Sequence, residues 1–375
     1  MGSCNCVEIN RTALRHNFEV CHNIVRDNAI LAMVKANGYG HGMVECASLF
    51  EAMGAAAFGV AETAEGVELR QAGITKPILI FTGVLPEMLD LIVKYALSPV
   101  VVDDDCLSML SSKALALQRE IAVHIKVDVG MGRQGCSVCD FSHLFAMVNS
   151  LPNLKLAGVL AHFPMSDDCG NKSTGEITKK FFREIVNRCE EDGGGDYYSH
   201  VANSGAILYF PETRLDMVRP GLMLYGYYPD GEAGRNRSLY PSLKPVMRFT
   251  SRIIQLRDLE TGVGLGYGHT AVTSRKTKLA LLPVGYADGY LRSMSNKGEV
   301  LIRGKRAPVV GRVSMNITMV DVTDIGSVSK DDEVVLLGQQ GNEEITADEI
   351  AVHMGTINYE VLCLLGNLNN RRYID

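Results

Sequence analysis

The feature that most constrains the fold is an alternation of short apolar runs with longer amphipathic segments between residues 30 and 221. The runs do not alternate strictly between apolar and polar residues, which is typical of parallel strands covered on both faces. Eight such runs interleaved with helical segments favour an α/β fold closed as a (β/α)8 TIM barrel over an open doubly wound sheet. The predicted strands are Ile30–Ala36, Ala55–Ala61, Pro77–Thr82, Pro99–Asp103, Ala122–Asp128, Leu156–Phe163, Tyr198–Ser204 and Leu215–Gly221, and the intervening helical stretches include Thr63–Gly73, Glu87–Leu97, Phe141–Leu151 and Lys179–Asp192.

The pattern changes after Gly226. Tyr227–Ser242 is rich in turn-forming residues and is interpreted as a linker. Beyond it the chain predicts a smaller, mostly-β domain, with one helix that begins at Thr346, has Glu349 as its capping-box partner and runs towards Leu365. We therefore expect domains at residues 1–235 and 236–375, with the first few residues as candidates to pair with the second domain. The predicted β runs are Met247–Gln255, Lys278–Pro283, Glu299–Gly304, Ala307–Val322 and Glu333–Gly338.

Composition excludes several classes of protein. A net charge of −6 argues against a nucleic-acid or anionic-membrane partner, which would need a basic surface. No apolar run reaches the ~20 residues that span a bilayer, and the N-terminus lacks the order of a secretory signal. The ten cysteines are scattered. Of the close pairs, Cys136 and Cys139 permit a metal or redox reading, but reduced cysteines are expected, so we predict a cytoplasmic protein without a metal.

Lys35 stands at the end of the first predicted strand, followed by the glycine-rich turn Asn37–Gly42. Catalytic groups of such barrels cluster at the carboxyl ends of the strands. Burial lowers the pKa of a lysine and makes its amine a nucleophile suited to a Schiff base. The alternative is a surface lysine at a strand exit, but the glycines favour a ligand because they let backbone approach it closely.

Polar residues repeat this placement at the ends of later strands. Taken singly, His200 has an alternative as a core histidine, Ser204 as a helix N-cap and Arg133 as a solvated loop charge. Their convergence on one rim favours function, and the last two strands of such barrels commonly build a phosphate site from loop amides. The set is Lys126 and Asp128 in the fifth strand with Arg133 just beyond it, His162 near the end of the sixth, His200, Asn203 and Ser204 in or after the seventh, and Arg219 and Gly221 at the end of the eighth with Leu222 after them.

A lysine after the first strand and a phosphate site after the last two is the layout that pyridoxal phosphate requires. Residues 33–42, MVKANGYGHG, match the attachment signature of alanine racemases. Seven further blocks follow in that family's order, so the resemblance covers roughly residues 6 to 375. The blocks are HIKVDVGMGR, HVANSG, VRPGLMLYG, GLGYG, PVGYADG, GRVSMN and INYE.

The resemblance implies an isomerase that interconverts L-alanine and D-alanine. Lys35 would bind the cofactor and exchange the Cα proton on one face, and Tyr267 of the partner subunit would act on the other. His162, Arg219 and His200 would support Tyr267, since a free tyrosine has a pKa of about 10. Arg219 would face the pyridine nitrogen and, because arginine does not give up a proton, leave that nitrogen unprotonated.

The remaining roles also come from the resemblance. Lys126 matches a lysine that is carbamylated in many members, where it holds Arg133. The family pattern implies a homodimer with shared active sites and a supply of D-alanine for peptidoglycan. Phosphate binding is assigned to Tyr39, Ser204, Tyr359, Gly221 and Leu222, with Asn203 beside them, and substrate binding to Arg133, Met315 and Tyr286.

One position departs from the family pattern. Asn316 follows Met315 where many members have Asp, which points towards serine-directed or broader specificity. Tyr359 argues for alanine, because a bulky side chain there leaves room for little more than a methyl group. Two further alternatives are a decarboxylase of basic amino acids and a non-catalytic vitamin B6-binding barrel. The decarboxylases use a late glycine triplet, whereas Gly193-Gly194-Gly195 precedes the seventh strand, and the barrel protein lacks a β domain.

Overall fold

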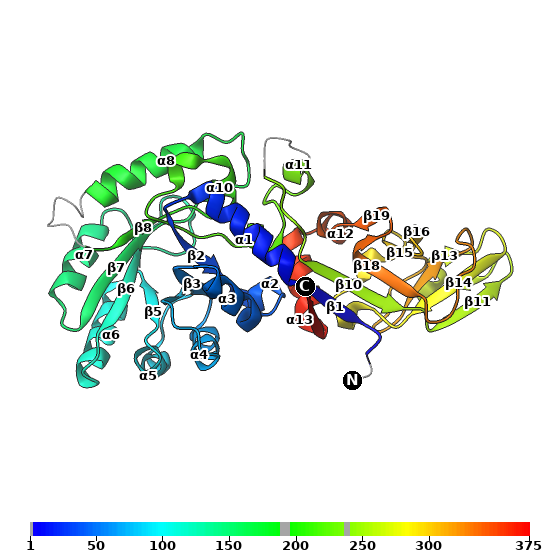
Figure 1. The fold of residues 1–375 in the computed structure, drawn as a ribbon, viewed down its shortest axis with the longest axis horizontal. Helices are drawn as coiled ribbons and strands as arrows, with labels where there is room; N and C mark the ends of the chain where they lie inside the picture. The colour runs from blue at the N-terminus through cyan, green and yellow to red at the C-terminus, as the bar shows by residue number, and fades with distance from the viewer. Residues whose placement is uncertain (1–2, 188–195, 236–240) are drawn as a thin grey trace. The chain divides into compact units, whose positions relative to one another are not determined.

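The computed structural model describes residues 3–187, 196–235 and 241–375. The chain divides into two compact units (Figure 1). We call Arg15–Gly38 with Met43–Leu243 the barrel unit, and Met1–Leu14 with Tyr39–Gly42 and Lys244–Asp375 the strand unit. The predicted boundary between residues 235 and 236 lies at the edge of the described residues, so the structure leaves it as an expectation.

The barrel unit contains the eight predicted parallel strands in one sheet, ordered β8-β7-β6-β5-β4-β3-β2-β9. The strands are apolar and mostly buried, as expected for a sheet covered by helices. Figure 1 shows α4 to α7 on the outer side of the strands. The bounds are β2 Ala29–Met33, β3 Ala57–Val60, β4 Ile78–Ile80, β5 Ser98–Val101, β6 Ile121–Lys126, β7 Leu154–Leu160, β8 Tyr198–His200 and β9 Met217–Val218, with helices α1 Arg11–Val25, α3 Met43–Ala52, α4 Thr63–Gln71, α5 Leu89–Lys94, α6 Asp104–Ala116, α7 Phe141–Ser150, α8 Ser173–Phe181, α10 Ser204–Tyr209 and α11 Glu232–Arg235.

The sheet nearly closes into a barrel. Its end strands β8 and β9 form no regular ladder, but the Asp216 carboxylate accepts the Ser199 N–H at 2.8 Å, and the Arg219 N–H reaches Ala202 O at 2.8 Å. The seam therefore carries one side-chain and one backbone hydrogen bond next to the residues predicted to be functional. The barrel fold is confirmed.

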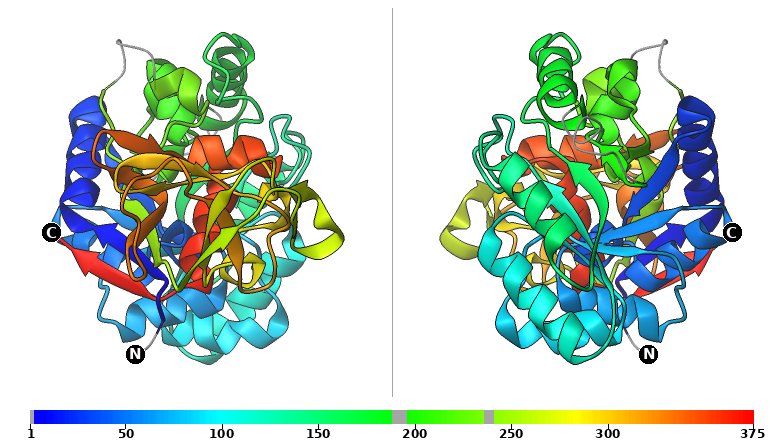
Figure 2. Two further views of the ribbon diagram at one scale, coloured as in Figure 1. Left: turned by 90° about the vertical axis from the view of Figure 1, so that its right-hand side faces the viewer. Right: turned by 90° about the vertical axis from the view of Figure 1, so that its left-hand side faces the viewer.

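The strand unit contains a seven-stranded sheet, a three-stranded sheet and a two-stranded hairpin. The first strand lies between two late ones, antiparallel to β10 and parallel to the last strand, β20 (Figure 2). The mostly-β architecture of the second part of the chain is confirmed. The bounds are β1 Cys6–Asn10, β10 Met247–Arg252, β11 Gln255–Leu259, β12 Gly264–Leu265, β13 Ala271–Val272, β14 Thr277–Leu282, β15 Glu299–Ile302, β16 Lys305–Pro308, β17 Thr318–Asp321, β18 Glu333–Gln340, β19 Glu343–Ile345 and β20 Arg371–Ile374.

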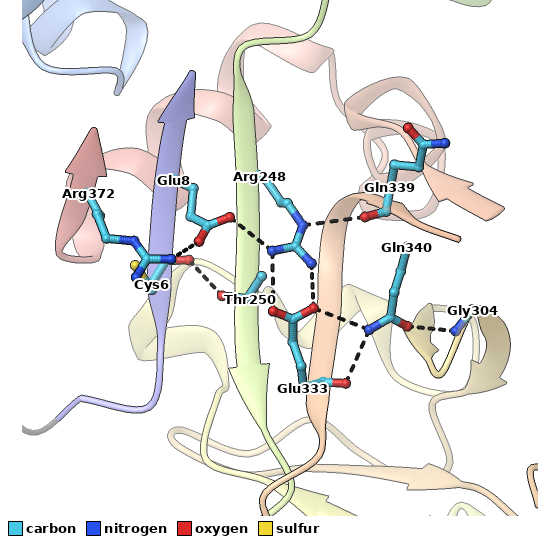
Figure 3. A network of polar contacts seen from close by, with 9 residues as sticks. All are labelled: Cys6, Glu8, Arg248, Thr250, Gly304, Glu333, Gln339, Gln340 and Arg372. Atoms are coloured by element: carbon cyan, nitrogen blue, oxygen red, sulfur yellow. Dashed lines mark hydrogen bonds and ion pairs between the residues drawn. The ribbon is translucent and has the colours of Figure 1, made fainter. Parts of the chain in front are cut away.

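A ladder of alternating charges crosses four adjacent strands of the large sheet (Figure 3). Glu8 on β1 binds Arg372 on one side and Arg248, at 2.9 Å, on the other. Arg248 also binds Glu333 of β18 at 2.5 Å and lowers the pKa of that carboxyl. Opposite charges on neighbouring strands stabilise their pairing, so this ladder ties the N-terminal strand to the rest of its sheet.

Some predicted boundaries are wrong. The helix expected at Lys179–Asp192 begins earlier, at Ser173, as α8, and the π-helical segment η2 (Phe182–Val186) continues it; residues 188–192 lie outside the described residues. The run Ala307–Val322 contains two strands rather than one, β16 and β17. The linker Tyr227–Ser242 contains the short helix α11.

The C-terminal helix is two helices, α12 (Ala347–Met354) and α13 (Asn358–Leu368), separated at Gly355, whose φ is 75°. Thr346 caps α12 by accepting the Glu349 N–H at 3.0 Å, as predicted. The expected reverse bond of the capping box is replaced, because Arg306 binds the Glu349 carboxylate at 2.6 Å.

Among the described residues no helix is long and apolar enough to cross a membrane. The nine described cysteines are free thiols. Burial, followed by the charge of Asp140, raises the pKa of Cys136 to about 12. A thiol with so high a pKa is a poor metal ligand and a poor nucleophile.

Candidate active site

Lys35 lies two residues beyond Met33, the end of β2, and begins a short left-handed turn, α2 (Lys35–Tyr39). Ala36, Asn37 and Gly38 have φ values of 53°, 55° and 62°. A left-handed conformation costs roughly 1–2 kcal/mol for each residue other than glycine. Backbone strain of this kind persists only where surrounding contacts impose it, and it clusters at functional sites. The glycine-rich turn predicted after Lys35 is therefore a strained feature that fixes the direction of the chain.

Three hydrogen bonds within the barrel unit hold this turn. The Gly38 N–H reaches Val34 O at 2.7 Å, and the Asn37 side chain accepts the Met43 N–H at 2.9 Å. The Ala36 N–H donates to a carboxylate oxygen of Glu65 at 2.7 Å. The turn is thus fixed from its own strand, from the start of α3 and from α4.

Lys126, at the end of β6, is buried and donates to Gln134 Oε1 at 3.1 Å. Burial, followed by the charges of Arg133 and Arg219, lowers its pKa to about 8. Asp128 opposes that shift. A buried ammonium among other cations is costly, so this region favours an anionic ligand or a neutral lysine.

Arg133 is exposed on the loop after β6, and the loop is shaped by Asp128. The Asp128 carboxylate accepts backbone N–H groups of Gly130, Met131 and Arg133 at 2.8, 2.8 and 3.2 Å. Burial would raise the pKa of Asp128, but these hydrogen bonds outweigh burial and lower it. Asp128 therefore stays ionised and fixes the loop that holds Arg133.

Arg219 is a buried donor that joins three strand ends. Its guanidinium donates to Ala161 O at 2.7 Å, His200 O at 2.6 Å and Val201 O at 3.1 Å. It also contacts Nδ1 of His200 at 3.1 Å and Nδ1 of His162 at 3.4 Å. Burial lowers the pKa of Arg219 to about 9. The predicted grouping of Arg219 with His162 and His200 is present.

Arginine only donates hydrogen bonds, so Arg219 fixes the tautomers of its neighbours. His200 must accept at Nδ1 and carry its proton on Nε2, which lies 3.0 Å from His124 Nδ1. His124 then carries its own proton on Nε2, as does His162. Burial and the charge of Arg219 lower the pKa of His124 and of His162 to about 3, and the pKa of His200 falls well below its usual value. All three rings are neutral at pH 7.

Ser204 lies at the predicted phosphate site. Its hydroxyl accepts the N–H of Gly221 at 2.9 Å and of Met223 at 3.3 Å, which joins α10 to the short helix η4 (Leu222–Tyr225). The N-cap of α10 is Asn203, so the alternative of Ser204 as an N-cap is wrong. Asn203 accepts the Ala206 N–H at 3.0 Å and the Ser166 hydroxyl at 2.8 Å. The structure brings Asn203, Ser204, Gly221 and Leu222 together.

The other predicted phosphate residues, Tyr39 and Tyr359, belong to the strand unit. Their rings lie 6.1 Å apart. Burial, followed by Tyr359 and Cys363, raises the pKa of Tyr39. The phenol of Tyr39 therefore stays protonated and can donate a hydrogen bond to an anion.

Tyr267, Tyr286 and Met315 lie on three loops of the strand unit. Tyr267 is in η5 (Tyr267–His269), between the hairpin strands β12 and β13. Tyr286, in η6 (Tyr286–Asp288), donates its N–H to Ser314 O at 3.1 Å, next to Met315. In the single chain the exposed fractions of Tyr267, Met315 and Tyr286 are 69%, 55% and 39%. In the single chain these three side chains are therefore accessible to another molecule.

Comparison with known proteins gives the family. The family model "Alanine racemase, N-terminal domain" matches residues 9–229, and "Alanine racemase, C-terminal domain" matches residues 246–373. The chain belongs to the alanine racemase family. An alanine racemase of Syntrophobacter fumaroxidans is 44% identical over 96% of this chain and 95% of that protein. The solved alanine racemase of Clostridium difficile 630 has a TM-score of 0.91 at 35% identity and covers 100% of this chain and 96% of its own.

One solved alanine racemase, from Bartonella henselae, has covalently bound pyridoxal phosphate. It has a TM-score of 0.88 and 26% identity, with 99% of each chain covered. Because both domain models of the alanine racemase family match, an isomerase is indicated and a barrel-only vitamin B6-binding protein is not. The glycine triplet Gly193–Gly195, which bears on the decarboxylase alternative, lies outside the described residues.

Three residues at this alanine racemase site were missed from the sequence: Glu65, His124 and Gln134. The sequence does indicate that His124 shares a face with Lys126, since it lies two residues before Lys126 and alternate residues of a strand share a face. Gln134 lies one position after Arg133, the last residue of the matched HIKVDVGMGR block. The sequence around Glu65 indicates only the start of a helix. Its contact with Ala36 is not predictable from the sequence, because it joins two segments that follow different strands.

Proposed function

We propose that this chain is a pyridoxal-phosphate-dependent alanine racemase, which interconverts L-alanine and D-alanine by a two-base mechanism with Lys35 and Tyr267. Family membership supports the reaction, and the placement of Lys35 in the barrel unit supports its role. The carrying observation is that Arg219 contacts Nδ1 of His162 at 3.4 Å, where the charges of Arg219, Arg133, Lys126 and Lys35 also lower the pKa of the ring. Four cationic groups gathered around one barrel rim suit an anionic cofactor and an anionic substrate.

The residues present fit pyridoxal phosphate. The Lys35 amine would bind it covalently, and its phosphate would be held by Tyr39, Asn203, Ser204, Tyr359 and the amides of Gly221 and Leu222. Arg219 would direct an N–H at the pyridine nitrogen and leave that nitrogen unprotonated. When bound, the cofactor withdraws electrons from the α-carbon of the amino acid and makes its α-proton acidic.

In this proposal Arg133 and Met315 bind the substrate carboxylate, and Tyr286 narrows the entrance. Lys35 Nζ exchanges the α-proton on one face and the Tyr267 oxygen exchanges it on the other. Racemisation needs both, because a proton removed from one side must return from the opposite side. The fixed tautomer of His162 presents its Nε2–H as a donor to the Tyr267 oxygen, which stabilises the phenolate that acts as the base.

The central test is exchange of the alanine α-proton in deuterated water with pyridoxal phosphate added. We expect exchange and racemisation with alanine, and loss of both in Lys35→Ala. Tyr267→Phe should retain exchange on the lysine face for one enantiomer while racemisation is lost. If the wild-type protein with cofactor exchanged no α-proton of alanine, the proposal would fail.

We also propose an obligate homodimer in which Tyr267 and Met315 of the second domain, residues 236–375, complete the partner's site. The exposure of both side chains in the single chain supports this. Mixing inactive Lys35→Ala with inactive Tyr267→Ala subunits should restore activity, because one site of each mixed dimer contains both residues. Absence of rescue in dimers shown by mass spectrometry to be mixed would contradict shared sites.

Serine or broad specificity is the second candidate, favoured by the exposed Asn316. The same exchange assay with serine measures this specificity. With lysine as the substrate it tests the alternative of a decarboxylase of basic amino acids. Asn316→Asp should raise the preference for alanine over serine if the missing charge at the entrance broadens specificity. If the D-alanine that the protein makes supplies peptidoglycan synthesis in the cytoplasm, the gene should restore growth of a bacterium that requires D-alanine.

A further inference from the structure

Glu65 has two carboxylate oxygens with separate partners. Oε2 accepts the N–H groups of Ala61 and Glu62, at 2.7 and 3.3 Å, at the start of its own helix, α4. Oε1 accepts the Ala36 N–H, at 2.7 Å, from the loop that follows a different strand, β2. One side chain therefore joins two neighbouring βα loops of the barrel unit.

Ala36 is the residue next to Lys35 and the first left-handed residue of the turn, with φ 53° and ψ 46°. The peptide group between Lys35 and Ala36 sets the direction in which the Lys35 side chain leaves the backbone. An alanine does not hold this conformation by itself, because its Cβ crowds the following carbonyl group. A charged acceptor is among the stronger hydrogen-bond partners for a backbone N–H, so Glu65 opposes relaxation of the turn at its first residue.

We propose that Glu65 is a positioning residue for Lys35: it fixes the Lys35–Ala36 peptide and thereby the approach of the Lys35 amine to the reacting centre. The alternative is a purely structural role, in which Glu65 only caps α4, as an acidic residue in the first turn commonly does. The two roles use different oxygens, so they can be separated by the length of the side chain.

The experiment compares Glu65→Asp, Glu65→Ala and the control Glu68→Ala. Asp keeps the negative charge at the start of α4 but is one methylene too short to cap α4 and reach Ala36 together. Glu68 lies three residues further along α4 and is exposed, so its replacement removes a charge of the same helix without touching the turn.

The first readout is hydrogen exchange of the Ala36 amide in the cofactor-free protein, measured by NMR. We expect exchange about tenfold faster or more in both Glu65 variants, which corresponds to about 1.4 kcal/mol, and unchanged exchange in Glu68→Ala. The second readout rests on the proposed function. In both Glu65 variants kcat for alanine should fall about tenfold with KM nearly unchanged, whereas the melting temperature should fall clearly only in Glu65→Ala.

Glu65→Asp with wild-type exchange at Ala36 and wild-type kcat would overturn the proposal and leave Glu65 as a helix cap. Faster exchange with unchanged kcat in both Glu65 variants would also overturn it, because the turn would then not govern the lysine. Failure of the proposed function is distinguishable, since it would appear as absence of racemisation in the wild-type protein while the exchange measurement still reported on the turn.

Discussion

In the barrel unit, the charges of Lys35, Lys126, Arg133 and Arg219 lower the pKa of the same histidine, His162, and Asp128 opposes the shift of Lys126. In the strand unit, Arg306 binds three carboxylates, those of Glu299, Glu343 and Glu349, at 2.8, 3.1 and 2.6 Å. Arg248 likewise binds two carboxylates in the ladder of Figure 3.

This difference separates charge used for function from charge used for structure. Buried cations such as Lys126 and Arg219 destabilise a protein unless hydrogen bonds or a ligand compensate them, and they persist at sites whose ligand is anionic. Networks in which each cation has several carboxylates stabilise the fold without a ligand. The two units therefore should respond in opposite ways when their cations are removed.

The largest effect is expected from Arg219→Lys. Lysine presents one ammonium in place of the planar guanidinium, so it cannot serve three carbonyl groups and two histidines together. We expect kcat for alanine to fall roughly a hundredfold, as for the loss of a preorganised donor. The control is Arg214→Lys, also a donor to backbone carbonyls in the barrel unit, but to those of Ile207 and Ile24, which are not part of this network. Equal losses of kcat in both variants would show that the effect is general.

Lys126→Met tests the cost of an uncompensated cation. The pKa of Lys126 lies near 8, below its usual value, so at pH 7 the folded protein holds a charge that it disfavours. Removing it should stabilise the cofactor-free protein by about 1–3 kcal/mol at pH 7, and the gain should shrink as pH rises above 8, where the wild-type amine becomes neutral. Calorimetry at pH 7 and 9.5 measures this, and activity should fall because Arg133 loses its neighbour.

The matched control for this variant is Lys155→Met on β7, which is exposed. It should change the melting temperature little at either pH. A lower melting temperature of Lys126→Met at pH 7 would contradict the distinction between the two units. Incubation with bicarbonate adds a further check, because a carbamylated Lys126 would increase the mass of the wild-type protein by one carbon dioxide and that of Lys126→Met by none at this site.

Arg306→Ala tests the opposite behaviour in the strand unit. Three carboxylates would lose their shared partner, so we expect a loss of about 1–2 kcal/mol in the free energy of unfolding. High salt should reduce the difference from the wild-type protein, since screening weakens partly exposed pairs. Urea unfolding at low and high salt measures both quantities. An unchanged midpoint would mean that the network does not stabilise this unit.

The sequence predicts the architecture well and the strained parts of the site poorly. The eight strands were recognisable because buried parallel strands leave apolar runs of the right length. The conformation of Ala36 was not, because alanine has no preference for positive φ and the bond that holds it comes from Glu65 in the first turn of α4. The break between α12 and α13 did have a signal, since a glycine such as Gly355 commonly ends a helix.

The site residues also divide into those that the sequence predicts and those whose details only the structure gives. Lys35, His162, His200 and Arg219 were placed correctly on strand ends, because a barrel gathers those ends at one rim. The tautomers of the histidines depend on donors from three strands, so only the structure gives them. The roles of Tyr267 and Met315 depend on a partner subunit and stay predictions.

The smallest expected effect concerns the neutral histidines. His124 and His162 have pKa values near 3 in the folded protein, and that of His200 is also far below its usual value. An unfolded histidine has a pKa of about 6.5, so the unfolded chain binds more protons between pH 6.5 and 3 and stability is lost as pH falls through this window. His124→Gln keeps an acceptor for His200 and should reduce the pH dependence of unfolding by at most ~1.4 kcal/mol per pH unit. Urea unfolding at pH 7, 6 and 5 measures the slope, with the exposed His22→Gln as the control. A slope in His124→Gln equal to that of the wild-type protein would mean that His124 already binds a proton in the folded barrel, which the donor chain from Arg219 forbids.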